Sequence, residues 1–143
     1  MSGQDPMSEP CRIVLAEDNP GDVGLVRRAL HEHAVTCDLR VLTDGEEVLS
    51  FFADLDQHVD RPCPDLLLLD LYLPKLDGSE VLKQLRASQR CARTKVVVLS
   101  SLNAPLHYQI AEHNGAVRFF EKPTSLGRFM DLGKIVKEVL AAA

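Results

Sequence analysis

The amino-acid sequence predicts an α/β fold, with a doubly wound, parallel five-stranded sheet between two layers of helices. Short apolar segments alternate five times with segments of helical periodicity, and the third and fourth apolar segments are continuous runs. Strands that alternate with helices form parallel sheets, and a strand without polar residues is buried on both faces. The 143 residues suit one domain, because no linker or internal repeat divides them.

The five expected strands are short, mostly apolar runs that end at a polar or turn-forming residue. Between the second helix and the third strand, residues 56–65 contain Pro62 and Pro64 and show no periodicity. This segment predicts a loop that is long for an α/β connection. In chain order, the strands are expected at 12–16, 39–43, 66–69, 95–99 and 117–120.

The five expected helices present apolar residues at intervals of three or four. The first begins where Asn19 can cap free backbone N–H groups and Pro20 suits the first turn. The fourth ends before Gly115, a residue type that favours the backbone conformation just beyond a helix. The last helix carries apolar residues beyond its core stripe, at Leu126 and Ile135. The helices are expected at 20–33, 45–54, 78–88, 105–114 and 125–142.

Composition excludes several classes of protein. Apolar residues make up 45% of the chain and charged residues 26%, which argues against disorder. No apolar run approaches the roughly 18 residues that a membrane span needs. The N-terminus lacks the basic and apolar segments of a secretory signal, and the net charge of −5 disfavours nucleic-acid binding. We therefore expect a cytoplasmic protein that binds neither membranes nor nucleic acid.

The four cysteines form no CxxC pair and have no histidine at zinc-ligand spacing. In a cytoplasmic protein they are expected to stay reduced thiols. They are Cys11, Cys37, Cys63 and Cys91. Residues 1–8, which include a second methionine at Met7, are expected to be a disordered tail or a cloning remnant. The domain is expected at 9–143.

Four of the expected strands are followed or closed by a charged or hydroxyl side chain. Parallel strands all end at one edge of the sheet, where α/β proteins place their sites. Three carboxylates there would repel one another unless a cation joined them, and oxygen ligands of this kind suit Mg²⁺. Such a metal could draw a phosphoryl group onto an adjacent carboxylate. The residues concerned are Glu17 and Asp18, Asp70, Ser100 and Lys122.

Each of these residues has a simpler explanation when it is taken alone. Glu17 and Asp18 can be acids at a helix start, Asp70 a loop acid, Ser100 a turn residue and Lys122 a solvated lysine. Their coincidence at the strand ends is what favours a site. Other chemistries lack their motifs, because the chain has no GxGxxG after the first strand, no GxxxxGK[ST], no aspartate two residues after Asp70 and no GxSxG. The histidines are expected to face solvent at positions 31, 33, 58, 107 and 113.

Five blocks of the sequence, in this order, resemble the receiver domain of two-component response regulators. The resemblance covers residues 11–142 and implies a flavodoxin-like (βα)5 fold with strand order 2-1-3-4-5. The long interval between Asp18 and Asp70 is similar to that of single-domain regulators paired with bacterial phytochromes. The blocks are 14–19 (VLAEDN), 70–78 (DLYLPKLDG), 97–101 (VVLSS), 115–116 (GA) and 119–123 (FFEKP).

The resemblance implies a role for each acidic residue of the site. Asp70 would accept a phosphoryl group from a phosphohistidine on a sensor histidine kinase, such as a bacteriophytochrome. Asp18, Asp70 and the backbone carbonyl of Tyr72 would bind Mg²⁺ directly, and Glu17 would bind it through water. Pro74 and Gly78 would shape the loop after the phosphoacceptor.

The resemblance also implies a switch. Lys122 and Ser100 would contact the phosphoryl group, with Ser100 replacing the commoner threonine. Phe119, which replaces the commoner tyrosine, would be the aromatic side chain that moves inward. The peptide bond between Lys122 and Pro123 would be cis, which is rare outside specified turns.

Two further positions tune self-dephosphorylation in this family: the second residue after the phosphoacceptor and the second after the switch hydroxyl. They correspond here to Tyr72 and Leu102. Leu102 has no group that orients a water by hydrogen bonding, and Tyr72 is bulky enough to crowd its approach. Slow self-dephosphorylation is therefore expected.

No output domain is expected after residue 143, so the output would be a protein–protein contact or onward phosphotransfer. The first hypothesis is a binding switch, and the alternative is a phosphate shuttle or sink that passes the group to a histidine phosphotransferase. A more distant one is a metal-dependent aspartyl phosphatase. In the first two cases the protein is no enzyme, although it assists its own phosphorylation and dephosphorylation.

A homodimer through the fourth helix, fifth strand and fifth helix is also expected. The fifth strand would lie at the sheet edge, where exposed backbone groups invite pairing. The resemblance to the phytochrome-type regulators implies the same face. The alternative is a monomer in which Arg118 and Glu121 guard this edge.

Overall fold

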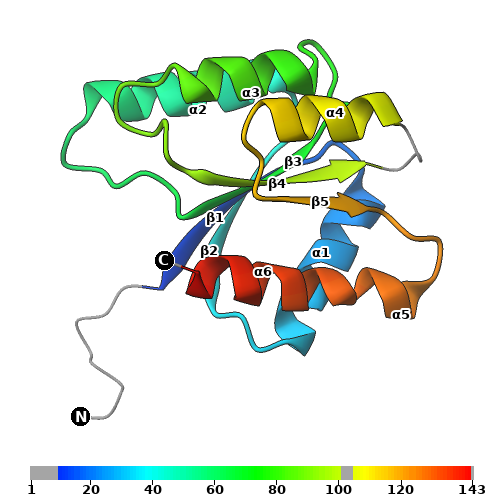
Figure 1. The fold of residues 1–143 in the computed structure, drawn as a ribbon. Helices are drawn as coiled ribbons and strands as arrows, with labels where there is room; N and C mark the ends of the chain where they lie inside the picture. Colours follow the sequence, from blue (N-terminus) through cyan, green and yellow to red (C-terminus); the bar gives the residue numbers. More distant parts are fainter. Residues whose placement is uncertain (1–9, 101–104, 143) are drawn as a thin grey trace, which may run out of the picture.

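The computed structural model describes residues 10–100 and 105–142, and these residues form a central sheet with helices on both faces (Figure 1). Within this part of the chain the sheet has five parallel strands in the order β2-β1-β3-β4-β5. The class, the parallel sheet and the strand order predicted above are confirmed. The strands are β1 (Cys11–Ala16), β2 (Cys37–Leu42), β3 (Leu66–Asp70), β4 (Lys95–Ser100) and β5 (Arg118–Glu121).

Helices cover the sheet in two groups (Figure 1). One face carries α2 (Gly45–Gln57), α3 (Gly78–Arg86) and α4 (Pro105–His113). The other carries α1 (Pro20–Glu32), α5 (Leu126–Phe129) and α6 (Asp131–Ala141). The cap predicted for α1 is present, since the Asn19 side chain accepts hydrogen bonds from Gly21 and Asp22.

The last helix differs from its prediction, because the single helix expected over 125–142 is divided at Met130. Met130 keeps a helical backbone, with φ −64° and ψ −19°, so α5 and α6 nearly continue one another. Sequence periodicity does not reveal the division, since Phe129 and Leu132 on either side of it are both in the core. Gly115 has φ +73° after α4, as its predicted role beyond a helix requires.

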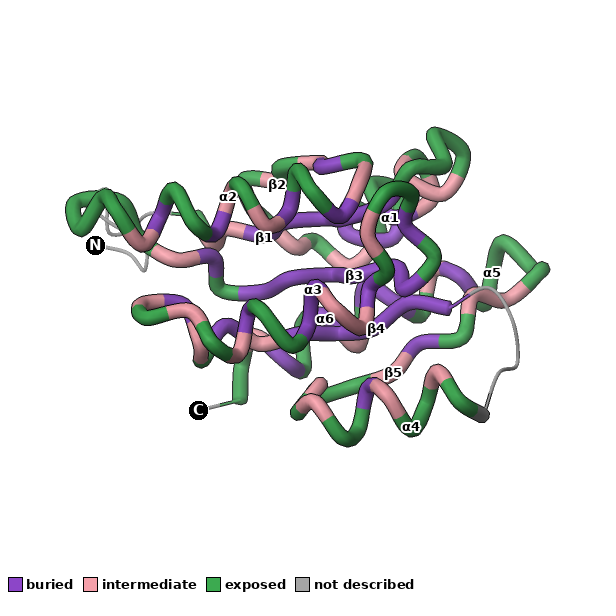
Figure 2. The backbone as a smooth tube through the Cα atoms, turned by 90° about the horizontal axis from the view of Figure 1, so that it is seen from above, coloured by how far each residue is buried: buried purple, intermediate pink, exposed green. Residues whose placement is uncertain are grey.

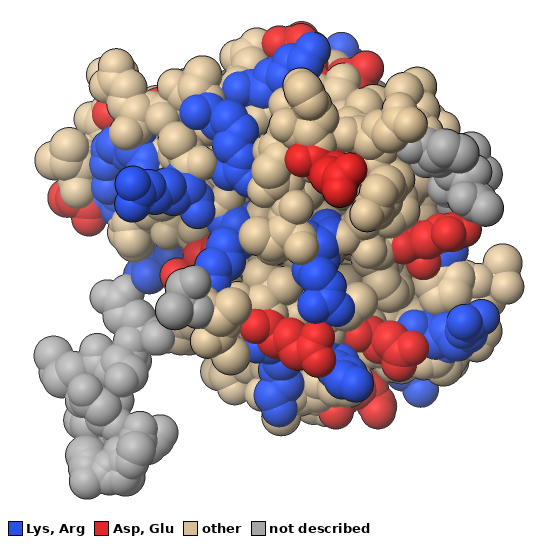
Figure 3. Space-filling model, viewed as in Figure 1, with Lys and Arg blue, Asp and Glu red and all other residues tan. Residues whose placement is uncertain are grey.

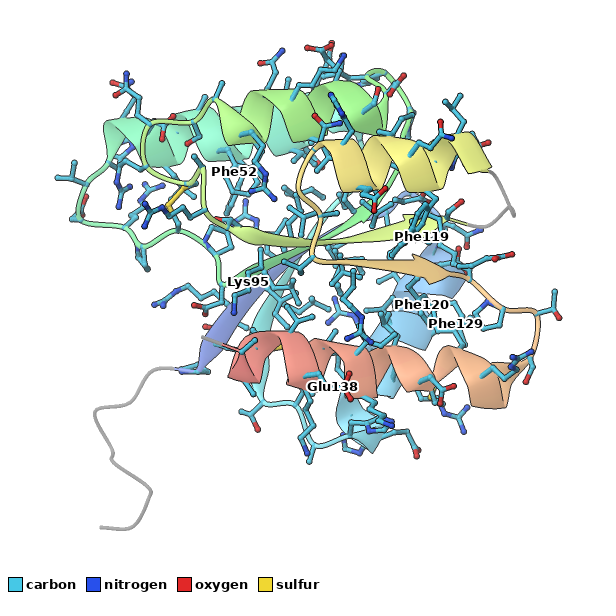
Figure 4. The ribbon with its side chains drawn as sticks, viewed as in Figure 1. Phe52, Lys95, Phe119, Phe120, Phe129 and Glu138 are labelled. Atoms are coloured by element: carbon cyan, nitrogen blue, oxygen red, sulfur yellow. A yellow bond between two sulfur atoms is a disulfide. The ribbon has the colours of Figure 1, made fainter. Side chains whose placement is uncertain are left out.

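The core consists of two apolar layers, one on each side of the sheet. Figure 2 shows buried residues concentrated along the central strands β1, β3 and β4. Strand β3 supplies both, since Leu67 and Leu69 face the layer under α2 and α3, whereas Leu66 and Leu68 face the layer under α1 and α6. All four leucines have no exposed surface. Figure 4 shows Phe52 beneath α2 and Phe129 on the opposite side of the sheet. The continuous apolar run that predicted a doubly covered strand therefore builds both layers.

One cysteine prediction is wrong, because Cys63 and Cys91 form a disulfide. Their Cα atoms are 5.6 Å apart, within the range that a disulfide bridges. Cys63 lies in the loop before β3 and Cys91 in the segment before β4, so the pairing depends on two loops that meet only in the folded chain. Cys11 and Cys37 are free thiols, as expected.

The surface has the mixed charge that the composition leads one to expect. Figure 3 shows acidic and basic side chains interspersed on the face it presents. Among the described residues, none of the helices combines the length and apolar character that a membrane crossing requires. The tail predicted at 1–8 lies outside the described residues.

Candidate functional site

Parallel register brings the predicted polar residues to one edge of the sheet. Asp70 is the last residue of β3, Ser100 is the last of β4, and Glu17 and Lys122 directly follow β1 and β5. Asp70 pairs in register with Leu99 next to Ser100, which aligns the central strand ends. Asp70, Glu17 and Ser100 are buried although all three are polar. Burial of polar side chains is costly unless they have partners, and each of the three has one.

Lys122 lies at the centre of these partners. Its side chain is 5% exposed, and its Nζ lies 2.6 Å from Glu17 Oε1, 3.0 Å from Asp70 Oδ2 and 2.8 Å from Asp22 Oδ2. An ammonium has three N–H donors, so each donor can meet one carboxylate. Asp22 was not predicted as a site residue. It sits in the first turn of α1, and the signal that could have found it is that this helix starts at the same sheet edge.

The two buried carboxylates are further fixed by backbone groups. Asp70 Oδ1 accepts a hydrogen bond from Tyr72 N at 2.8 Å, and Glu17 Oε2 accepts one from Asn19 N at 3.2 Å. Asp70 is therefore held at one oxygen by the backbone and at the other by Lys122. These contacts fix the carboxylate in one orientation at the floor of the site.

Burial changes the proton affinity of the central groups. It raises the pKa of the Glu17 carboxyl to about 7, although the hydrogen bond from Lys122 opposes the shift. Burial alone would lower the pKa of Lys122, but its hydrogen bonds to Asp22 and Glu17 and the charge of Asp70 raise it above its ordinary value. Lys122 is therefore a permanent cation at neutral pH.

The loop that follows Asp70 is shaped by glycine and proline, as predicted. A Cβ on Gly78 would lie 2.6 Å from Leu71 Cα, so only glycine lets α3 start so close to the strand end. The carbonyl of Pro74 accepts hydrogen bonds from Gly45 N at 3.2 Å and Leu76 N at 2.8 Å. The loop is thus closed onto the start of α2 and keeps Tyr72 beside the site.

Three carboxylates are arranged so that they could hold a metal ion. Glu17, Asp18 and Asp70 each offer an oxygen, and these oxygens lie within 4.8 Å of one another. Glu17 and Asp70 are buried, whereas Asp18 is exposed at the mouth. Hard oxygen donors with one open side are suited to a divalent cation that keeps water ligands. The residues predicted as metal ligands therefore fit such an ion.

Ser100 contacts a histidine that was expected to face solvent. Ser100 Oγ lies 3.1 Å from His107 Nδ1 in α4, and the His107 ring lies 4.5 Å from the Tyr72 ring between centroids. The expectation is wrong for His107, which is half-buried, and for the half-buried His33. For His107 it fails because periodicity along a helix does not show what the first turn covers, and for His33 because its ring lies against Gly133 of α6 at the end of α1. His31, His58 and His113 are exposed, as expected.

The other residues predicted to take part in a switch are placed as follows. Phe119 is half-buried between β5 and α4 (Figure 4), with its ring edge-on to Tyr108 at 5.6 Å between centroids. Tyr72 is 48% exposed, so its ring stands at the mouth of the site. Leu102 lies outside the described residues.

The cis prediction is wrong, because none of the described peptide bonds is cis and Lys122–Pro123 is therefore trans. The trans form is the more stable isomer of an X–Pro bond by about 0.5–1 kcal/mol. In this trans arrangement Lys122 is held at two points. Its ammonium contacts the carboxylates described above, and its backbone N donates a hydrogen bond to Ser100 O at 2.6 Å.

Comparison with known proteins gives a consistent result. Residues 13–133 match the family described as the response regulator receiver domain. The chain is 35% identical over 131 residues to the probable methanogenesis regulatory protein FilR2 of Methanothrix harundinacea, covering 92% of this chain and 82% of that protein. It is 36% identical over 97 residues to the response regulator Rcp1 of Synechocystis, covering 68% and 66%.

Solved structures agree with this assignment. The phosphorylated cyanobacterial phytochrome response regulator RcpA superposes with a TM-score of 0.82 at 29% identity, covering 94% of this chain and 97% of RcpA. The Mn²⁺-bound form of Rcp1 superposes with a TM-score of 0.81 at 28% identity and the same coverage. Family match, fold and the acidic strand-end cluster all agree, and the chain belongs to the receiver domain family of two-component response regulators.

Proposed function

We propose that the protein accepts a phosphoryl group on Asp70 from a sensor histidine kinase and changes a protein-binding surface in response. The observation that carries this proposal is the placement of Asp70. Its carboxylate is buried, held in one orientation by Tyr72 N, and joined to the Lys122 ammonium at 3.0 Å. Phosphoryl transfer needs positioning and charge neutralisation more than covalent activation, and this site supplies both.

In the reaction, an Asp70 oxygen forms the new bond to phosphorus while the bond between phosphorus and the kinase imidazole nitrogen breaks. The leaving nitrogen keeps the electron pair. Glu17, Asp18, Asp70 and the backbone carbonyl of Tyr72 would hold Mg²⁺, which when bound supplies positive charge against the phosphoryl oxygens. Lys122 supplies the second positive charge from the end of β5, at the same edge of the sheet. The protein thus assists its own phosphorylation and is not itself an enzyme with turnover.

Ser100 and His107 connect this site to α4. The hydroxyl of Ser100 now pairs with His107, and it lies at the end of the strand next to Asp70. When a phosphoryl group forms on Asp70, Ser100 turns its hydroxyl toward a phosphoryl oxygen and the contact with His107 is lost. The added charge of about −1.5 to −2 is large enough to bias such an alternative.

The surface that responds is the face formed by α4, β5 and the divided last helix, α5 and α6. Leu106 and Tyr108 of α4 are 64% and 52% exposed, and Val117 before β5 is 48% exposed. We infer that this face forms a homodimer. Arg118, one of the two charged residues that could guard the edge strand, is paired at 3.2 Å with Glu138 of α6. Light scattering with and without beryllofluoride, as a phosphoryl mimic, tests this. A monomer in both states, or a dimer unaffected by Tyr108→Glu, would exclude the interface.

Relatives suggest the upstream partner. RcpA is described as a phytochrome response regulator, so a bacteriophytochrome-type histidine kinase is the partner that we propose. Phosphotransfer from a radiolabelled kinase of this class would be compared with transfer from an unrelated kinase. Equal rates from both would contradict the proposed partner.

The central test is phosphorylation by acetyl phosphate with Mg²⁺, measured as intact mass. One phosphoryl group is expected on the wild-type protein and none on Asp70→Asn. Asp60→Asn removes an exposed carboxylate in the loop before β3 and serves as the control, with full labelling expected. Undiminished labelling of Asp70→Asn would overturn the assignment.

A further inference from the structure

Among the described residues, Asp22 is the one carboxylate bonded to Lys122 that does not belong to the candidate metal cluster. Its Oδ2 lies 2.8 Å from Lys122 Nζ, and its side chain is 25% exposed. The oxygens that converge for a metal come from Glu17, Asp18 and Asp70. Asp22 comes from another element, the first turn of α1, where its own N donates to the Asn19 side chain at 3.1 Å. Its position is therefore fixed independently of the strand ends.

The other two partners of Lys122 make additional contacts in the proposed function. Glu17 and Asp70 are also metal ligands in the proposed function, and Asp70 becomes the acyl phosphate. A bound divalent cation would share their charge and repel the Lys122 ammonium. Asp22 is neither a metal ligand nor the phosphoacceptor in the proposed function, so its contact with Lys122 has no such competitor. Lys122 is a long, flexible side chain whose ordering costs conformational entropy, so a constant partner decides where its ammonium stays.

We propose that Asp22 is a positioning residue that anchors the Lys122 ammonium beside Asp70 before phosphoryl transfer and keeps it against the phosphoryl oxygens afterwards. The inference rests on the proposed function for its effect on rate, but the anchoring itself is a property of the free protein. Without Asp22, Lys122 would be held only by carboxylates that also bind the metal in the proposed function.

The first experiment measures anchoring in metal-free protein. Acetylation by an amine-reactive ester, followed by peptide mapping, reports the reactivity of each lysine. Lys122 is expected to be strongly protected in the wild-type protein and to react several-fold faster in Asp22→Asn, which keeps the shape and loses the charge. Asp22→Glu should restore most of the protection. Unchanged protection in Asp22→Asn would overturn the anchor.

The second experiment measures phosphorylation by acetyl phosphate with Mg²⁺. Loss of one charge-assisted hydrogen bond from the transition state corresponds to roughly tenfold in rate, so Asp22→Asn is expected to be slower by about that factor. The matched control is Asp131→Asn, an exposed acid in the first turn of α6, which should keep the wild-type rate. Thermal unfolding confirms that both variants are folded.

A double-mutant cycle separates anchoring from a general structural role. If Asp22 acts through Lys122, Asp22→Asn should have little further effect in a Lys122→Met background. Additive effects would overturn the proposal. A wild-type protein that is never phosphorylated would refute the proposed function and the rate effect, whereas normal wild-type labelling with an unaffected Asp22→Asn would refute this inference alone.

Discussion

The edge of the sheet at the carboxyl ends of its strands and the edge at their amino ends are built differently. At the carboxyl ends of the strands, three carboxylates contact one ammonium and the carboxylate of Asp18 lies within 4.8 Å of two of them, so negative charge exceeds positive charge there. At the opposite edge, Arg90 donates to the carbonyls of Leu55, His58 and Arg61, and a disulfide joins the same loops.

The difference shows which edge serves stability and which serves function. Backbone carbonyls accept the N–H groups of Arg90 and add no negative charge. The Arg90 edge therefore has no surplus of carboxylates that would favour a further cation. The Lys122 edge carries surplus negative charge, which favours a further cation; burial, together with the charge of Asp70, raises the pKa of Glu17 there. A site that tolerates such imbalance is typical of function, because stability alone would not retain it.

The largest effect is expected from Lys122→Met, which removes the only ammonium from the carboxylate cluster among the described residues. Phosphorylation by acetyl phosphate should slow by about a hundredfold or more, as for loss of a group that stabilises transition-state charge. Divalent-metal affinity should rise, because the competing cation is gone. Calorimetric titration with Mg²⁺ and a labelling time course measure the two effects. A weaker metal affinity in this variant would contradict the charge argument.

The second expectation concerns the opposite edge. Replacing Cys63 and Cys91 by serine opens a loop with a sequence separation of 28 residues, which should cost about 3–4 kcal/mol of the free energy of unfolding in the chain-entropy model. Urea unfolding measures this loss, and reduction of the wild-type protein by dithiothreitol should reproduce it. Cys11→Ser is the control. The phosphorylation rate should not change, and a large drop would mean that the two edges are coupled.

The strand-end residues could be predicted from the sequence because sheet topology determines their position. Once five strands are parallel, Asp70, Ser100 and Lys122 must reach the same edge, whatever their side-chain conformations. The two core layers follow for the same reason, since a run such as Leu66–Leu69 leaves no polar face for solvent.

Contacts made by the first turns of helices could not be predicted in this way. Asp22 and His107 reach the site because α1 and α4 begin over the strand ends, and helical periodicity describes the sides of a helix and not its start. The Cys63–Cys91 disulfide depends on two loops meeting in space. The division at Met130 escaped because the apolar stripe continues across it.

A third expectation concerns pH at the Lys122 edge. Burial raises the pKa of Glu17 from 4.5 to about 7, so the carboxyl is mostly protonated below that pH. It must lose this proton before it can help to hold a metal ion. Mg²⁺ affinity should therefore rise by up to about tenfold between roughly pH 6 and 8. In metal-free protein the same shift makes stability fall as pH rises from about 4.5 to about 7.

Glu17→Gln is the test variant, since it keeps the shape and cannot titrate. Calorimetric titration should show a nearly flat pH dependence of Mg²⁺ affinity in this variant over the same interval. A dependence as steep as in the wild-type protein would show that another group titrates, and the assignment to Glu17 would be wrong.

The smallest effect is expected at the contact that links the site to α4. One neutral hydrogen bond contributes about 0.5–1.5 kcal/mol, so loss of the His107 imidazole should shift the balance between the two Ser100 arrangements only by roughly two- to tenfold. In His107→Ala, hydrogen exchange of α4 amides in the unphosphorylated protein should rise toward the phosphorylated level. The difference between the two states should shrink accordingly, because α4 has lost its contact with the Ser100 hydroxyl. Gln109→Ala removes an exposed side chain of the same helix, and it should leave that difference intact. If α4 in His107→Ala exchanged like α4 in the wild-type protein in both states, the phosphorylation signal would have to reach this face through Phe119 and Tyr108, whose rings are in edge-on contact.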